Sequence, residues 1–206
     1  MSRDPRPVLR VWPPEDHRVN EGLRLVLDGL YDVPGLEFPT PPRILDIGCH
    51  NGSASVFFAW RWPGAQILAF EPSPENAAIA RINVAGIAEL SQLAVVGEGM
   101  AEEMMLYDRV ADGNTGERSL YRLHNSETGD MVKTVRARDL PPCDIVKIDT
   151  EGAELPILRD YPHLAGVRAI MLEWHREEDR AELARWLPTL GFRLLRAAGR
   201  DLVFVR

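Results

Sequence analysis

The feature that most constrains this chain is a strand that runs directly into a glycine-bearing turn and then into a helix. Residues 44–52 read Ile-Leu-Asp-Ile-Gly-Cys-His-Asn-Gly. Gly48 and Gly52 allow a ligand to approach the backbone closely, and the helix start that follows offers unpaired N–H groups. In a doubly wound α/β sheet such a turn lies at the carboxyl edge of the strands, where ligands bind. The unit therefore predicts an α/β fold with a ligand site after its first strand.

Strands and helices alternate along most of the chain after residue 42. Strands are predicted at residues 43–47, 66–70, 93–96, 145–148 and 167–173, and helices at residues 53–62, 74–85, 153–158 and 177–187. Residues 97–138 are less regular, with a strand-like run at 131–135, and residues 192–195 and 202–205 predict a hairpin around Gly199. This order predicts a doubly wound, mostly parallel sheet that ends in an antiparallel hairpin.

The first 42 residues have a different pattern. Residues 1–16 are rich in Pro, Arg and Asp and predict an irregular arm, apolar spacing from Val19 to Leu30 predicts a helix, and prolines make residues 33–42 a loop. We therefore divide the chain into an N-terminal arm and helix, residues 1–42, and one α/β domain, residues 43–206. The N-terminal part is expected to act as a lid on the substrate pocket.

Charge and composition exclude several classes of protein. The net charge of −7 argues against a nucleic-acid partner. The chain has no apolar run of membrane-spanning length, and its N-terminus lacks the apolar stretch of a secretory signal, so we expect a cytoplasmic protein without a membrane partner. Cys49 and Cys143 are too few for a disulfide framework and are expected to be small buried residues.

A second motif follows the next strand, where Glu71-Pro72-Ser73 opens a helix. An acid about 20 residues beyond a glycine turn can accept hydrogen bonds from ribose hydroxyls. Dinucleotide enzymes share this acid, but their turn carries a third glycine that brings the helix against a pyrophosphate. This turn has only Gly48 and Gly52, with Asp46 before them. The pattern favours S-adenosylmethionine, which has no pyrophosphate and carries an ammonium group that an acidic loop attracts.

Carboxylates and a histidine follow two later strands. Asp149 ends the strand at residues 145–148, and Glu151 lies in the turn beyond it. Two carboxylates at the edge that binds the cofactor can orient a hydroxyl group and take its proton. Lys147 lies on the same strand face as Asp149, where its charge keeps the carboxylate ionised. The side chain of Glu154 is interpreted only as a charge that favours a helix start.

His175 follows the fifth strand and completes the predicted catalytic group. Its ordinary pKa suits a base at neutral pH. We therefore predict that His175 or Glu151 takes the proton of the acceptor and that Asp149 positions it.

Four segments, in this order, resemble the FkbM family of methyltransferases: ILDIGCHNGSAS, ILAFEPSPENAAIARIN, VKIDTEGAELPIL and IMLEWH. The resemblance covers residues 43–205. It implies a Rossmann-like class I methyltransferase sheet of seven strands, S-adenosylmethionine as donor, and O-methylation of a small-molecule acceptor such as a polyketide or sugar. Asp46, Gly48, Asn51 and Glu71 match its cofactor positions, and Asp149 and Glu151 match its acidic motif.

The predicted site combines these assignments. The cofactor is assigned to Asp46, Gly48, Cys49, His50, Asn51, Gly52, Glu71, Pro72 and Ser73, and catalysis to Asp149, Glu151 and His175. The acidic motif is also similar to the Asp-x-Asp segment of sugar O-methyltransferases that hold a divalent metal. Because the second acid here is Glu and the sequence indicates no third ligand, a metal-free site is preferred. Two alternatives stay open: a nucleotide-binding oxidoreductase and a non-catalytic S-adenosylmethionine-binding module.

Overall fold

The computed structural model of the chain describes residues 7–11, 24–108, 118–121 and 128–206. Its centre is a seven-stranded sheet in the order β3-β2-β1-β7-β8-β10-β9. The strands are β1 (Arg43–Ile47), β2 (Gln66–Phe70), β3 (Glu89–Ser91), β7 (Ile145–Ile148), β8 (Ala169–Glu173), β9 (Arg193–Ala198) and β10 (Asp201–Val205). The first five strands pair in parallel, and β10 runs antiparallel to both β8 and β9. The predicted mostly parallel sheet with a final antiparallel hairpin is confirmed.

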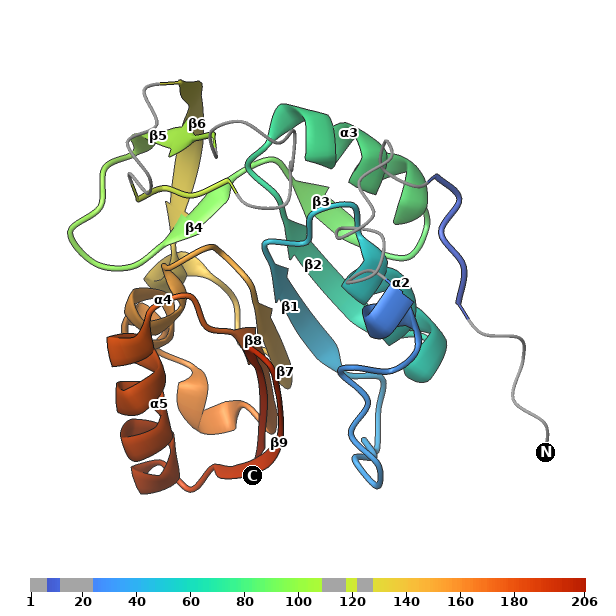
Figure 1. Cartoon of the computed structure of the whole chain (residues 1–206). Coiled ribbons are helices and arrows are strands. Elements are labelled where there is room, and N and C mark those ends of the chain that lie inside the picture. The colour runs from blue at the N-terminus through green and yellow to red at the C-terminus, as the bar shows by residue number, and fades with distance from the viewer. Residues whose placement is uncertain (1–6, 12–23, 109–117, 122–127) are drawn as a thin grey trace.

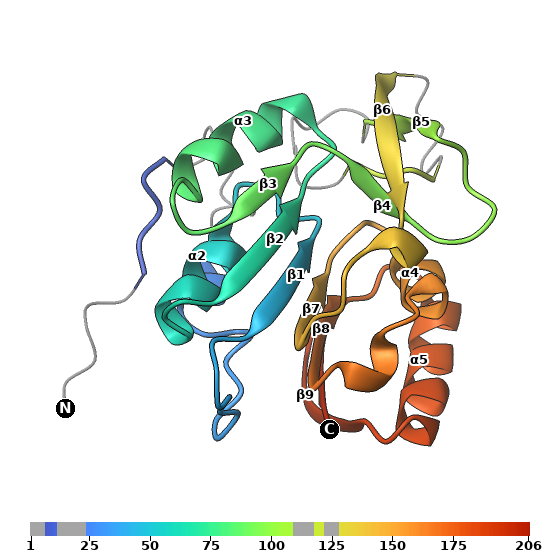
Figure 2. The same ribbon diagram turned by 180° about the vertical axis from the view of Figure 1, so that it is seen from behind.

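Helices cover both faces of this sheet. The helices α2 (Ser53–Arg61) and α3 (Pro74–Asn83) lie beside β1 to β3, and α4 (Glu154–Asp160) and α5 (Glu177–Thr189) lie beside β7 to β9 (Figure 1; Figure 2). Alternate residues of one strand pack into opposite layers, because side chains of a strand alternate between its faces. Ile44 lies in a buried cluster with Phe58 of α2, and Leu45 lies in a second cluster with Leu158 of α4. The sheet is therefore the middle of three layers.

The prediction for the third strand was wrong in part. Residues 94–96 do form a strand, β4 (Ala94–Val96), but it leaves the central sheet. Its place beside β2 belongs to β3, which has the short and mostly polar sequence Glu-Leu-Ser. A three-residue edge strand of this composition has no apolar periodicity to reveal it, whereas all three residues of β4 are buried and gave the stronger signal.

A second sheet occupies the stretch that looked irregular in the sequence. The order of its strands is β4-β6-β5, with β5 at Glu103–Tyr107 and β6 at Gly129–Arg136. It stands beside the start of α4, at the carboxyl ends of β1 and β7 (Figure 2). Its buried cluster includes Leu106 and Leu120. Of the two strands β5 and β6, the sequence indicated only the run at residues 131–135.

The N-terminal region is described in part. Residues 24–27 are helical, as predicted, and residues 19–23 of the predicted helix and most of the predicted arm lie outside the described residues. Val26, Tyr31, Val33 and Leu36 pack into the same buried layer as α2. In residues 7–11, the N–H of Val11 donates to the side chain of Asn83, at the end of α3, at 2.8 Å. Within the described part of the chain, every helix is too short or too polar to cross a bilayer.

Candidate active site

The glycine turn after β1 is held between the ends of the neighbouring strands. Gly48 has a φ of 73°, and a side chain there would place its Cβ 1.7 Å from the carbonyl oxygen of Asp149. The N–H groups of Gly48 and Cys49 both donate to the carbonyl of Phe70, at 2.9 Å. Glycine is therefore required where the ends of β1, β2 and β7 meet, because both the backbone conformation and the space exclude any other residue.

A buried ion pair supports the turn from below. Lys147 of β7 is 4% exposed and donates to the carbonyl of Gly48. Its Nζ lies 3.4 Å from Asp46 Oδ1 and 3.9 Å from Asp149 Oδ2, and Ser55 donates to the other oxygen of Asp46 at 2.6 Å. Burial alone would lower the pKa of Lys147, but these two carboxylates raise it. Asp46 thus lies buried beneath the turn, and its predicted contact with the cofactor stays a prediction.

Other residues assigned to the cofactor also support the loop from behind. Asn51 is fully buried, accepts from the N–H of Ser53 at 3.2 Å, and receives a hydrogen bond from Asn83 on its carbonyl at 2.9 Å. Gly52 has a φ of 85° at the start of α2, and Cys49 is a buried free thiol. These residues fix the shape of the turn and lie outside the lining of the cavity next to it.

The cavity opens above the turn and encloses about 560 Å³, part of it open to solvent. Its lining is shared between the ends of the central strands and the small sheet, and comprises Gly48, His50, Glu71, Pro72, Asn76, Leu93, Ala94, Val95, Leu106, Arg118, Leu120, Asp149, Thr150 and Glu151. The fold therefore brings the glycine turn, the acid after β2 and the two acids after β7 to one space, as the sequence predicted.

Glu71 is held on one side of the cavity by backbone donors. The N–H of His50 donates to its Oε2 at 2.8 Å, and the N–H of Ser73 donates to its Oε1 at 2.9 Å. Burial raises the pKa of Glu71 to about 7, against the opposing effect of these hydrogen bonds. Burial likewise lowers the pKa of His50 to about 4, so that this ring is neutral near pH 7. Ser73 itself caps α3 and receives a hydrogen bond from Arg118 at 3.1 Å.

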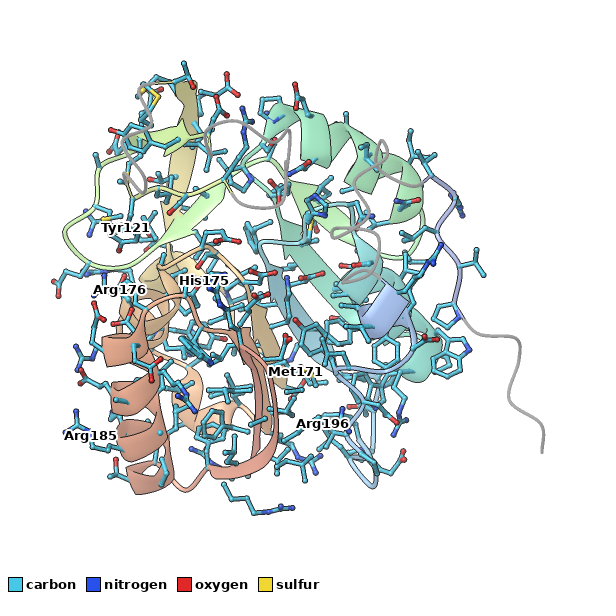
Figure 3. The ribbon with its side chains drawn as sticks, viewed as in Figure 1. Tyr121, Met171, His175, Arg176, Arg185 and Arg196 are labelled. Carbon is cyan, nitrogen blue, oxygen red and sulfur yellow. The ribbon has the colours of Figure 1, made fainter. Side chains whose placement is uncertain are left out.

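The predicted catalytic group lies on the other side of the cavity, where Asp149 and Glu151 line it and His175 lies behind them. His175 Nε2 lies 3.3 Å from Glu151 Oε2 and 3.6 Å from Glu173 Oε1. Ligand atoms of Asp149, Glu151 and His175 all lie within 4.8 Å of one another. The three residues predicted from two different strand ends thus meet in space, and Figure 3 shows His175 at this edge of the sheet.

Glu154 belongs to this group, although the sequence indicated only a helix start. It is fully buried, and its Oε1 lies 3.0 Å from His175 Nδ1. The same oxygen accepts from the backbone N–H groups of Thr150 and Gly152 at 3.1 and 3.0 Å. Glu154 therefore fixes the ring of His175 and the turn that carries Glu151. Its position in the first turn of α4 could not reveal this, because its partner His175 follows β8, 21 residues further along the chain.

The charge state of His175 corrects the expectation of a base with an ordinary pKa. Burial alone would lower the pKa of His175, but the hydrogen bonds and charges of Glu151 and Glu154 raise it to about 11. The ring is then a cation near pH 7. Burial raises the pKa of Glu151, against the effect of His175, and raises that of Glu173 to about 8. A cationic ring has no free lone pair for a proton, so this charge state favours Glu151 over His175 among the two predicted bases.

Two further residues lie beside this group and were missed in the sequence. Asp201, at the start of β10, is paired with Glu173 of β8. Tyr31, from the N-terminal region, is 2% exposed and donates to Asp201 Oδ1 at 3.1 Å. Burial raises the pKa of Asp201 to about 6 and also raises that of Tyr31. Neither residue lies near a recognisable motif, so only the fold places them here.

The donor set of Asp149, Glu151 and His175 fits a divalent cation in its chemistry, with two carboxylates and one imidazole nitrogen. Glu154 on Nδ1 is also the kind of partner that a metal-bound histidine has. In the structure, however, Nε2 already faces Glu151 and Glu173, so the group is satisfied by its own ion pairs. The metal-free site stays a prediction.

The fold is that of class I methyltransferases. The C-terminal domain of precorrin-6Y C5,15-methyltransferase from Rhodobacter capsulatus superposes with a TM-score of 0.53 at 17% identity, over 100% of this chain and 98% of that one. The model of the methyltransferase FkbM domain matches residues 46–194 of the sequence. The chain therefore belongs to the FkbM methyltransferase family, as the four motifs indicated.

The sequence is also similar to several curated proteins. Methyltransferase sdnD of Sordaria araneosa is 28% identical over 208 residues, covering 82% of this chain and 80% of the relative. The 2-O-methyltransferase NoeI of Sinorhizobium fredii is 29% identical over 143 residues, covering 60% of this chain and 58% of the relative. Membership of this family favours methyl transfer over the alternative of a nucleotide-binding oxidoreductase.

Proposed function

We propose that the protein is an S-adenosylmethionine-dependent O-methyltransferase that acts on a hydroxyl group of a small molecule. The observation that carries this proposal is one cavity with Glu71 on one side and Glu151 on the other. A carboxylate suited to binding ribose hydroxyls, Glu71, and a carboxylate suited to accepting a hydroxyl proton, Glu151, thus face the same cavity. The relative NoeI is a 2-O-methyltransferase, which supports transfer to oxygen.

The donor side suits the nucleoside part of S-adenosylmethionine. Each oxygen of Glu71 carries one backbone hydrogen bond and keeps lone pairs for ribose hydroxyls. Leu93, Ala94 and Val95 offer an apolar wall for a base beside it. The methionine end would lie along Gly48 and His50, toward Asp149. S-adenosylmethionine supplies an electrophilic methyl group on a sulfonium, and the residues here hold and orient it.

The acceptor side suits proton removal by Glu151. The hydroxyl oxygen attacks the methyl carbon, the carbon–sulfur bond breaks to leave S-adenosylhomocysteine, and the hydroxyl proton passes to Glu151. Burial raises the pKa of Glu151, which makes it a better base than an exposed glutamate. The cationic ring of His175 keeps it ionised before the reaction, and Asp149 positions the hydroxyl. Positioning of the two reactants supplies much of the remaining rate.

The N-terminal region is proposed to close the acceptor side. Tyr31 reaches Asp201 beside the catalytic group, and Arg196 donates to the carbonyls of Gly29 and Leu30 at 3.2 and 2.6 Å. These contacts support a lid formed by the part of residues 1–42 that follows the arm. Such a lid would exclude water and shape the pocket for the acceptor.

The proposal is tested with labelled S-adenosylmethionine and a panel of hydroxyl-bearing small molecules, each paired with its deoxy analogue. Label should pass only to the hydroxyl compounds, and mass spectrometry should locate it on oxygen. Calorimetry with S-adenosylhomocysteine, NAD and NADP should show binding of the first alone. Transfer to carbon or nitrogen would overturn O-methylation, and binding without any transfer would favour the non-catalytic module.

Metal dependence is tested in the same assay. EDTA should leave the rate unchanged, because the ion pairs of His175 already satisfy the catalytic group. A loss of activity that Mg²⁺ restores would recast Asp149, Glu151 and His175 as ligands of a cation. Addition of Mg²⁺ or Mn²⁺ should also leave the thermal unfolding midpoint unchanged, since a bound ion would raise it.

A further inference from the structure

The short segment of residues 118–121 lies between the two sides of the cavity, and its side chains alternate between them. Arg118 and Leu120 line the cavity, and Arg118 reaches Ser73, next to Glu71. Ser119 and Tyr121 face the turn that carries Glu151. Figure 3 shows Tyr121 near Arg176 and His175.

Ser119 makes a buried hydrogen bond to this turn. Its hydroxyl donates to the carbonyl oxygen of Glu151 at 2.7 Å, and the residue is only 2% exposed. The N–H of Tyr121 donates to the same hydroxyl at 3.1 Å, which orients it as a donor. A backbone bridge to Tyr107 of β5 holds Ser119 in place, at 2.8 and 3.2 Å. The donor is thus fixed by the small sheet.

The turn needs such support because Glu151 has a φ of 55°, in the left-handed region that non-glycine residues rarely adopt. The peptide that joins Glu151 to Gly152 is held at both ends. Ser119 holds its carbonyl, and Glu154 accepts from its N–H at 3.0 Å. With this peptide plane fixed, the side chain of Glu151 faces His175 Nε2 at 3.3 Å.

We propose that Ser119 is a positioning residue that holds the strained backbone of Glu151, so that its carboxylate faces the acceptor hydroxyl. This inference rests on the proposed function, in which Glu151 is the base. Ser119 itself touches neither donor nor acceptor. Because residues 118 and 120 line the cavity that would hold the donor, the same segment connects the donor side of the cavity to Glu151.

The test uses Ser119→Ala, with Ser119→Thr as the variant that keeps a hydroxyl. Thr134→Val is the matched control, because Thr134 makes an equivalent hydroxyl-to-carbonyl bond of 2.7 Å to Ala101, elsewhere on the small sheet. Ser119→Ala should lower kcat about tenfold, as the loss of one hydrogen bond does, with the Kd for S-adenosylhomocysteine within about twofold of the parent. Ser119→Thr should restore most of kcat, and Thr134→Val should change neither value.

Two further measurements make the result decisive. In a Glu151→Gln background, Ser119→Ala should cause no further loss of kcat, because its effect passes through Glu151. A further tenfold loss there, or an unchanged kcat for Ser119→Ala alone, would overturn the inference. Crystal structures of the parent and of Ser119→Ala should show a displaced Glu151 carboxylate in the variant. If Glu151→Gln keeps its activity, the assignment of Glu151 as the base fails. The crystal structures then still show whether the loss of the Ser119 hydroxyl displaces the Glu151 carboxylate. If Ser119→Ala does not fold, Ser119→Cys serves in its place, because it fills the position and replaces the hydroxyl with a much weaker donor.

Discussion

The two sides of the cavity are built in different ways. On the donor side, Glu71 is held by N–H groups of the backbone, and Gly48 by strands that pack against it. On the acceptor side, Glu151 depends on side chains from several elements, with His175, Glu154 and Ser119 among them. The donor side is therefore a property of the fold and of local motifs, whereas the acceptor side is a network whose members support one another.

The largest expected effect lies on the acceptor side. Glu151→Gln should lower kcat by about a hundredfold or more, because the amide cannot take the hydroxyl proton. The Kd for S-adenosylhomocysteine should stay unchanged, since the donor side keeps its own supports. Initial rates with saturating donor, and calorimetry, measure the two values. Glu177→Gln, on the exposed start of α5, is the control and should behave as the parent.

The second-largest effect is expected on the donor side, where a substitution should weaken cofactor binding. Glu71→Ala should weaken binding of S-adenosylhomocysteine by about 1.5–3 kcal/mol, as expected for hydrogen bonds to a charged group. This corresponds to roughly a 10- to 150-fold rise in Kd. Glu75→Ala changes an exposed acid in the first turn of α3, the helix that follows Glu71; it is the matched control and should leave Kd unchanged. An unaltered Kd for the Glu71 variant would remove this residue from the donor site.

The same contrast explains what the sequence predicted. The central sheet, its four helices and the donor motifs follow from apolar periodicity and from glycines at fixed positions, and these are local signals. Sequence reasoning missed β3, whose three residues carry no period, and the small sheet made by β4, β5 and β6. It did not indicate the ion pair that Asp46 makes with Lys147 under the turn, because that contact joins two separate strands.

The acceptor side was predicted only in outline. Asp149, Glu151 and His175 follow strand ends, so their approach to one edge could be inferred. The role of Glu154 and the raised pKa of His175 could not, because both depend on distances between separate elements. Nothing in the sequence connects Ser119 to Glu151, because its partner lies in the loop after β7.

A smaller effect concerns pH on the donor side. In the ligand-free protein the pKa of Glu71 is raised to about 7, so the group holds a proton below that pH and is ionised above it. If the carboxylate is the form that binds ribose hydroxyls, the Kd for S-adenosylhomocysteine should rise about tenfold between pH 8 and pH 6. Glu71→Gln should lose most of this dependence. A variant curve parallel to that of the parent would assign the titration to Glu173 or Asp201, whose pKa values are raised to about 8 and about 6.

The smallest expected effect tests whether the N-terminal region serves the acceptor side alone. Removal of residues 1–16 breaks the backbone contacts of Val11 with Asn83, at 2.8 Å each, and leaves the packed residues from 24 onward intact. The thermal unfolding midpoint should fall by only a few degrees, on the order of the loss of one or two hydrogen bonds. If the arm helps to close the lid, the KM for the acceptor should rise about threefold to tenfold while the Kd for S-adenosylhomocysteine stays constant. Tyr31→Phe provides the comparison, because it removes the hydroxyl beside Asp201 without shortening the chain, and it should raise the same KM. An unchanged acceptor KM in both variants would mean that the lid proposal is wrong and that the catalytic group is complete without the N-terminal region.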